Sequence, residues 1–322
     1  ESITWTTDGA NAGSVFYHIN EKFSITNVCG LLRVIDRDRI STRFVYYCLR
    51  AVARDYVNYG MGNPKLMSGA MARIKIPVPP MPVQQEIVRI MDNLTACTDK
   101  IITDLSAERS AIRLQFEYYR DKLLNFGDYK TRPFGEMATI ARGSSPRPIN
   151  KFITNDENGV NWIKIGDVQP GSKYITSTKE KITREGARKS RLVHPGDFVL
   201  SNSMSFGRPY IMKIEGCIHD GWLSISGFEK YYTPDFLYHL LSSGKIQRIL
   251  NQRASNGIVK NLNVDIVESV ELPLVPLEEQ ERIASLLDRY DAICNELSDC
   301  LTYEIEARRK QYEWAAGTVI KL

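Results

Sequence analysis

Apolar residues recur every three or four positions along residues 82–125, the spacing of one face of an α-helix. Pro82 stands where such a helix can begin, and Gly127 stands where it should end. The same spacing returns along residues 278–320, so the pattern predicts two helices, each about 60 Å long at 1.5 Å per residue. The apolar positions are Ile87, Ile90, Leu94, Cys97, Ile101, Leu105, Ile112, Phe116 and Leu123 in the first helix, and Ile283, Leu286, Tyr290, Ile293, Leu297, Leu301 and Ile305 in the second.

Each predicted helix has a single apolar stripe, and a lone helix of that kind is only marginally stable in water. The simplest partner for each is the other, packed antiparallel about a pseudo-twofold axis. The alternative is that each helix packs on its own globular domain. We favour the paired arrangement because of the length of the helices.

The rest of the chain is predicted to be mixed and β-rich. Apolar segments at 162–165, 197–200 and 210–214, bounded by Gly, Asp and Pro, predict short strands. Residues 233–250 have helical spacing, and 255–257 contain an Asn-Gly turn signal. The expected fold is therefore α+β, with two β-rich mixed domains separated by two long antiparallel coiled-coil helices.

An internal repeat with an offset of 196 residues organises the chain, because residues 76–92 align without gaps on residues 272–288. The match continues for about fifty residues and weakens upstream, where 44–49 resemble 236–241. Each copy thus combines a globular part with a long helix. The identical pairs include Pro77 and Pro273, Pro80 and Pro276, Gln84 and Gln280, Ile87 and Ile283, and Asp92 and Asp288.

The repeat predicts four segments, which are two globular parts at 1–75 and 126–275 and two helical parts at 76–125 and 276–322. Residue 1 aligns near residue 195 of the second copy. If the copies are equal in length, roughly seventy residues of the first globular part are expected to precede it.

Charge separates the two kinds of segment. The globular parts carry net charges of +4 and +5, whereas the helical parts carry −1 and −4. A polyanionic partner would therefore meet the globular parts. A mildly positive solvated surface is the alternative explanation of this charge.

The sequence contains no recognisable catalytic signature. It has no GxxxxGK(S/T) phosphate loop, no GxGxxG, no HExxH, no GxSxG and no Asn-Pro-Pro-aromatic methyltransferase motif. His219 next to Asp220 favours a structural turn over a metal or acid–base pair. The six cysteines form no CxxC pair, which predicts reduced structural thiols, no metal site and a cytoplasmic protein. No apolar run approaches the length of a membrane span.

Polar loops on the basic segments are the remaining candidates for function. Arg suits guanine or phosphate, Asn suits adenine, and Ser suits either base or phosphate. Taken singly, each loop is also explained by ordinary turn chemistry. Recurrence in both copies favours DNA. The candidate contacts are Arg142, Ser144, Ser145, Arg147, Asn202, Ser203, Ser205, Arg208, Asn256, Lys260 and Asn261 in the second copy, and Asn11 and Lys65 in the first.

Residues 273–288, their equivalents ending at Asp92, and residues 115–124 resemble the repeated helical regions of type I restriction–modification specificity subunits. Residues 161–167 and 196–198 resemble parts of the target recognition domains of that family. The resemblance covers essentially the whole chain, apart from the start of the first recognition domain.

The resemblance implies a non-catalytic subunit that reads double-stranded DNA. In the family, two recognition domains each read half of a bipartite target site, and the helices hold two methyltransferase (modification) subunits. S-adenosylmethionine would belong to those methyltransferases, so this chain is expected to need no cofactor of its own. Restriction subunits can join the complex. A protein-interaction scaffold with a paired-helix spacer, and an enzyme of unrecognised type, are the alternatives.

Overall fold

The computed structural model describes residues 1–322 except 61, 128, 169–170, 203–205, 255–261 and 321–322. The chain forms two compact units. Unit 1 comprises residues 1–110 and 297–322, and unit 2 comprises residues 111–296. The long helices α3 (Met81–Leu123) and α8 (Leu277–Ile320) each contribute to both units.

A small antiparallel sheet forms the centre of unit 1, with strand order β2-β1-β3. The buried Trp5 lies against Gly30 of the neighbouring strand, where a Cβ would approach the indole ring to 2.2 Å. The Trp5 indole N–H also donates to the carbonyl of Leu66 over 2.9 Å. The elements are β1 (Ser2–Thr6), β2 (Val15–His18), β3 (Cys29–Leu32), α1 (Thr42–Val52), η1 (Ala53–Tyr56) and α2 (Ser68–Met71).

Helix α1 links this sheet to the long helices of unit 1. Its Val45 and Leu49 pack into the core around the sheet. Its Phe44 and Tyr47 pack with Met91 of α3 and with the end of α8. One short helix therefore has two buried faces, as expected for an element between two layers.

Unit 2 contains two larger sheets and a short β-ribbon. The sheets have strand orders β5-β14-β11-β12-β8 and β10-β13-β7-β9-β6, and β15 pairs with β4. The strands are β4 (Thr131–Pro133), β5 (Thr139–Arg142), β6 (Ile153–Thr154), β7 (Val160–Ile163), β8 (Tyr174–Ile175), β9 (Glu180–Ile182), β10 (Arg191–Val193), β11 (Phe198–Ser201), β12 (Pro209–Met212), β13 (Gly216–Ile218), β14 (Trp222–Ser226) and β15 (Glu271–Pro273). The helices are η2 (Phe134–Glu136), η3 (Ile149–Lys151), η4 (Ile165–Asp167), α4 (Arg184–Ala187), α5 (Pro234–Ser242), α6 (Gly244–Ala254) and α7 (Val264–Glu268).

Strand β11 is buried on both faces, and its successive side chains point alternately into two different cores. Phe198 and Leu200 pack toward α5 and the start of α8. Val199 packs on the other face, with Ile163 and Ile218 of the second sheet. Unit 2 is therefore layered as helices, sheet, sheet, which confirms the predicted α+β class.

The repeat is visible in the topology. In unit 1 the strand order is β2-β1-β3, and in unit 2 β12-β11-β14 has the same antiparallel pairing. A helix follows the third strand in both, α1 in one and α5 in the other. The outer sheet of unit 2 has no counterpart among the described residues of unit 1.

The helix predicted over 233–250 is interrupted. Ser243 has ψ 146° and ends α5, and α6 then begins at Gly244. The Gly244 N–H donates to the Asp121 carboxylate at 3.0 Å. A carboxylate at a helix N-terminus is stabilising, and this long-range contact is absent from the local pattern that predicted one helix.

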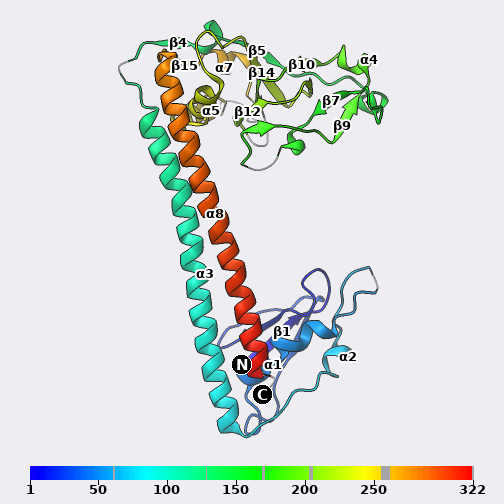
Figure 1. Cartoon of the computed structure of the whole chain (residues 1–322). Helices are drawn as coiled ribbons and strands as arrows, with labels where there is room; N and C mark the ends of the chain where they lie inside the picture. Colours follow the sequence, from blue (N-terminus) through cyan, green and yellow to red (C-terminus); the bar gives the residue numbers. More distant parts are fainter. Residues whose placement is uncertain (61, 128, 169–170, 203–205, 255–261, 321–322) are drawn as a thin grey trace. The chain divides into compact units, whose positions relative to one another are not determined.

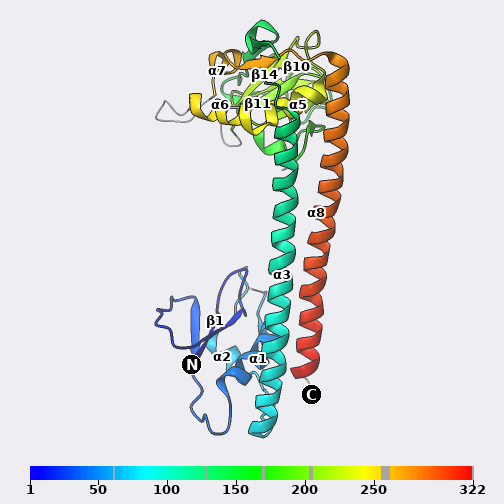
Figure 2. The same cartoon turned by 90° about the vertical axis from the view of Figure 1, so that its left-hand side faces the viewer.

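The predicted antiparallel pairing of the long helices is confirmed within each unit (Figures 1 and 2). In unit 1 the Thr95 hydroxyl lies 3.0 Å from that of Tyr312, and Arg109 donates to Thr302. In unit 2 the ring centroid of Phe116 lies 5.6 Å from that of Tyr290. Each helix also packs on its own globular part, so both proposed arrangements occur together.

Candidate nucleic-acid interface

The loop after β5 is held against the turn before β14 by a close backbone approach. The Gly143 N–H donates to the Trp222 carbonyl at 2.8 Å. A Cβ on Gly143 would lie 2.1 Å from the His219 carbonyl oxygen, a distance that backbone atoms do not allow. Glycine is therefore required here, and it places the predicted 142–147 loop beside residues 219–222.

Asp220 connects several of the predicted DNA contacts. Its carboxylate accepts from the Ser145 hydroxyl at 2.8 Å and lies 3.6 Å from an Arg147 guanidinium nitrogen. Its backbone carbonyl accepts from the Asn202 amide at 2.8 Å and from Arg142 Nε at 3.4 Å. The structure thus brings together two loops that are far apart in sequence.

The hydrogen bond from Ser145 lowers the pKa of the Asp220 carboxyl below its ordinary value, and the neighbouring His219 and Arg147 contribute in the same direction. Asp220 is therefore a carboxylate at neutral pH. Nothing in the local sequence distinguished Asp220 from an ordinary turn residue, because its partners come from elsewhere in the chain.

The predicted contacts of unit 2 differ in exposure. Arg142, Ser144 and Arg208 are exposed, and the Arg147 side chain is 84% exposed. Asn202 is only 2% exposed, and its amide is engaged by Asp220, so it supports the loop from within. The remaining predicted residues, Ser203, Ser205, Asn256, Lys260 and Asn261, lie outside the described part of the chain.

Unit 1 brings its own two predicted loops together. The Gly9 N–H donates to the Pro64 carbonyl at 3.0 Å, which joins the turn containing Asn11 to the segment containing Lys65. The Lys65 ammonium lies 3.5 Å from the Asp8 carboxylate, and Asn11 is exposed. A predicted cation paired with a carboxylate therefore occurs in each unit.

An equivalent backbone contact follows the central strand in both units. The Leu66 N–H donates to the Thr7 carbonyl at 2.9 Å, and the Leu262 N–H donates to the Asn202 carbonyl at 3.1 Å. Leu66 and Leu262 are equivalent in the repeat. Each copy thus places the residue just after its central strand beside this leucine.

A family model described as "Type I restriction modification DNA specificity domain" matches residues 1–108 and 127–307. The chain belongs to this family. It is a DNA specificity subunit, and its relatives are named as specificity subunits of type I systems.

Relatives with this name come from several bacteria. The EcoR124I/EcoR124II specificity subunit of Escherichia coli is 26% identical over 87% of this chain and 70% of its own length. A putative type I specificity subunit of Haemophilus influenzae is 29% identical over 86% of this chain and 71% of its own length. A putative type I specificity subunit of Mycoplasma pneumoniae is 43% identical over 40% of this chain and 71% of its own length.

Solved structures support the same fold. A chain from a study of complex assembly and conformational transition in the type I restriction–modification system covers 99% of this chain and 81% of its own length, with a TM-score of 0.82 and 16% identity. The HsdS subunit from Thermoanaerobacter tengcongensis covers 92% of this chain and 73% of its own length, with a TM-score of 0.53 and 17% identity.

The specificity subunit is non-catalytic, as its family membership indicates. His219 is structural: the Gly221 N–H donates to its Nδ1 at 2.7 Å, and burial lowers the pKa of its imidazole. In the described part of the chain, no group of three or more His, Cys, Asp or Glu side chains is placed to hold a metal ion.

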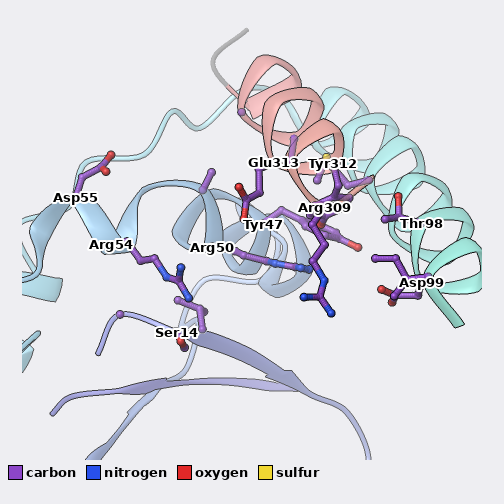
Figure 3. A pocket seen from close by; sticks show the side chains of 17 residues that line it. Ser14, Tyr47, Arg50, Arg54, Asp55, Thr98, Asp99, Arg309, Tyr312 and Glu313 are labelled. Atoms are coloured by element: carbon purple, nitrogen blue, oxygen red, sulfur yellow. The ribbon is translucent and has the colours of Figure 1, made fainter. Parts of the chain in front are cut away.

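A cleft of about 650 Å³ in the specificity subunit was not predicted from the sequence (Figure 3). It lies within unit 1, where Arg50 of α1 reaches toward α8 and its guanidinium carbon sits 4.8 Å from the Tyr312 ring centroid. Arg54 and Arg309 also line it, but acidic side chains balance their charge, so the cleft does not favour a polyanion. These acidic side chains are Asp55, Asp99 and Glu313.

The paired helices of the specificity subunit present equivalent aromatic side chains. Phe116 and Tyr312 are buried against the opposite helix. Two residues further on, Tyr118 and Trp314 are 62% and 73% exposed. These two positions are related by the repeat offset.

Among the described residues, no helix is both long and apolar enough to cross a membrane.

Proposed function

We propose that this specificity subunit reads a bipartite double-stranded DNA site with its two globular parts and holds two methyltransferase subunits on its duplicated helices. The proposal includes the division into recognition domains at 1–75 and 126–275 and helices at 76–125 and 276–322. It also includes the predicted contacts named above. Such a subunit would work beside DNA in the cytoplasm, and restriction subunits would join the same complex.

The observation that carries the proposal is the recurrence of one plan. In both copies the residue just after the central strand, Thr7 or Asn202, accepts a backbone hydrogen bond from the equivalent leucine, Leu66 or Leu262. Both globular parts also contain predicted cations, and their net charges are +4 and +5. Two copies of one reading surface suit a target with two separate halves. The scaffold alternative is not favoured by the family assignment.

Exposure supports different roles for the candidates. Arg147 and Arg208 are open to solvent and suit guanine edges or phosphates. Asn202 is buried and suits a supporting role. In unit 1, Lys65 suits a phosphate, and the exposed Asn11 offers an amide.

The exposed Tyr118 and Trp314 support two partner positions. Large aromatics that stay exposed on a helix are typical anchors of protein interfaces. Because they occupy equivalent positions, each would contact the same site on one methyltransferase. S-adenosylmethionine would be bound by those partners. Mass measurement of the purified complex tests the expected ratio of two methyltransferases to one specificity subunit, and an assembly with one methyltransferase that methylates DNA fully would contradict it.

The decisive experiment maps the methylated positions in DNA from cells carrying the full complex. The proposal predicts one sequence in two separated halves. The triple variant Arg147→Ala, Arg208→Ala and Lys260→Ala is then expected to bind that site weakly, with a salt dependence reduced by about one unit per lost phosphate contact. Unchanged binding of the mapped site would show that these residues do not contact DNA.

A further inference from the structure

A carboxylate stands in the middle of the predicted DNA contacts of unit 2. Asp220 lies 3.6 Å from Arg147 and accepts from Ser145, and its side chain is 48% exposed. DNA phosphates are anions, so a carboxylate at this place opposes binding to any duplex. Its position is therefore poorly explained by affinity alone.

The Asp220 carboxylate lines a shallow hollow of about 540 Å³. Pro146, Pro148 and Ile149 provide an apolar lining, and Asn150 and Arg147 are also part of the wall. Both Arg147 and Asp220 line this hollow, so a group entering it meets a guanidinium donor beside a carboxylate acceptor.

The ion pair between Arg147 and Asp220 can break and re-form easily. An exposed pair of this kind contributes little stability, because water competes for both partners. The Arg147 side chain, which is 84% exposed, can therefore shift toward DNA while the carboxylate remains within reach. The backbone carbonyl of Asp220 is occupied separately by Asn202 and Arg142, so the turn itself does not depend on the carboxylate.

We propose that Asp220 is a specificity-determining positioning residue, which directs Arg147 to a G·C base pair and away from phosphates. The inference rests on the proposed function, since it needs the 142–147 loop to face DNA. The guanine edge offers neutral acceptors, which a guanidinium can engage while it stays beside a carboxylate. The paired cytosine offers an N4 donor that suits a carboxylate. A phosphate, in contrast, is repelled by Asp220.

The test uses Asp220→Asn in the full complex with its methyltransferases. Asparagine keeps an oxygen for Ser145 and removes only the charge. Binding is measured over a series of salt concentrations, with the duplex carrying the methylation-mapped site and with a scrambled duplex of equal composition. Binding to the scrambled duplex is expected to tighten and its salt dependence to steepen by about one unit. The ratio of specific to non-specific affinity is expected to fall on the order of tenfold.

Two further variants make the result specific. Glu229→Gln removes the same charge from an exposed position after β14, at the opposite end of that strand, and is expected to leave the affinity ratio unchanged. Asp220→Glu retains the charge and is expected to recover part of the ratio. Thermal unfolding of each variant reports on folding independently of DNA.

The outcomes separate the inference from the proposed function. If the unaltered complex does not prefer the mapped duplex, the proposed function fails. If it does prefer that duplex but Asp220→Asn leaves the ratio unchanged, the positioning role is wrong. Equal weakening on both duplexes would also overturn it, because a purely structural contact would give that result.

Discussion

Gln280 gives the sharpest prediction about stability. Its side chain is fully buried at the start of α8. The amide donates to the carbonyls of Tyr231 at 2.7 Å and Val275 at 2.8 Å, and its oxygen accepts from the Thr233 N–H at 2.9 Å. One glutamine thus satisfies three backbone groups, which are the buried Val275 carbonyl and the half-buried Tyr231 carbonyl and Thr233 N–H, and it ties α8 to the segment before α5.

Gln280→Leu keeps the approximate volume and removes all three hydrogen bonds. Each buried group left unsatisfied costs about 1–3 kcal/mol. We therefore expect the free energy of unfolding of unit 2 to fall by about 3 kcal/mol or more. For a domain of this size the midpoint of thermal unfolding should fall by about 2–4 °C per kcal/mol, or about 6–12 °C in total.

The assay is thermal unfolding combined with hydrogen exchange, because a chain with two units has no single unfolding free energy. Loss of protection should concentrate in unit 2 around α5 and the start of α8. The control Gln115→Leu makes the same chemical change at an exposed position of α3 and should shift the midpoint little. A fall below about 2 °C for Gln280→Leu would refute the reasoning from unsatisfied groups.

Two other predictions concern the helices. Leu105→Asp in α3 and Leu301→Asp in α8 each place a charge at a half-buried position, so each should lower the stability of unit 1 by about 1–2 kcal/mol, measured by thermal unfolding. Leu114, which is 66% exposed, should tolerate Asp. Burial raises the pKa of Asp288, but its hydrogen bonds to His239 and Lys173 outweigh this and set it below the ordinary value. The ionised Asp288 therefore stabilises the fold at pH values above the ordinary carboxyl pKa. This contribution is lost as the pH falls through the lowered pKa of Asp288 in the folded protein. Asp288→Asn should make acid unfolding below about pH 4 less steep, and an unchanged acid profile would contradict the linkage.

Much of the fold was predictable because the relevant signals are local or repeated. Helices predicted over 82–125 and 278–320 are observed over Met81–Leu123 and Leu277–Ile320. A helix of that length averages its periodicity over many turns, so no single residue decides it. The repeat offset also placed equivalent residues correctly, because Gln84 and Gln280 make matching hydrogen bonds at the start of their helices.

The same periodicity did not determine which apolar residues are buried. Ile90 and Ile101 belong to the predicted stripe but are 38% and 41% exposed, whereas Met91 is 1% exposed. Met91 packs against Phe44 and Tyr47 of α1. A contact made by another element shifts the buried face of a helix, and spacing along the helix carries no information about that element.

By itself, the sequence determined the class of chain: two copies of one plan, long paired helices, basic globular parts and polar loops suited to DNA. Only the tertiary structure decided how the candidate site is arranged. It turned Asn202 inward, and it brought Asp220 to Ser145 and Arg147 across some seventy-five residues of chain. The close approach at Gly143 makes that meeting possible. Local propensities act over a few neighbouring residues, but a site is built from backbone segments that meet only after the sheets have packed.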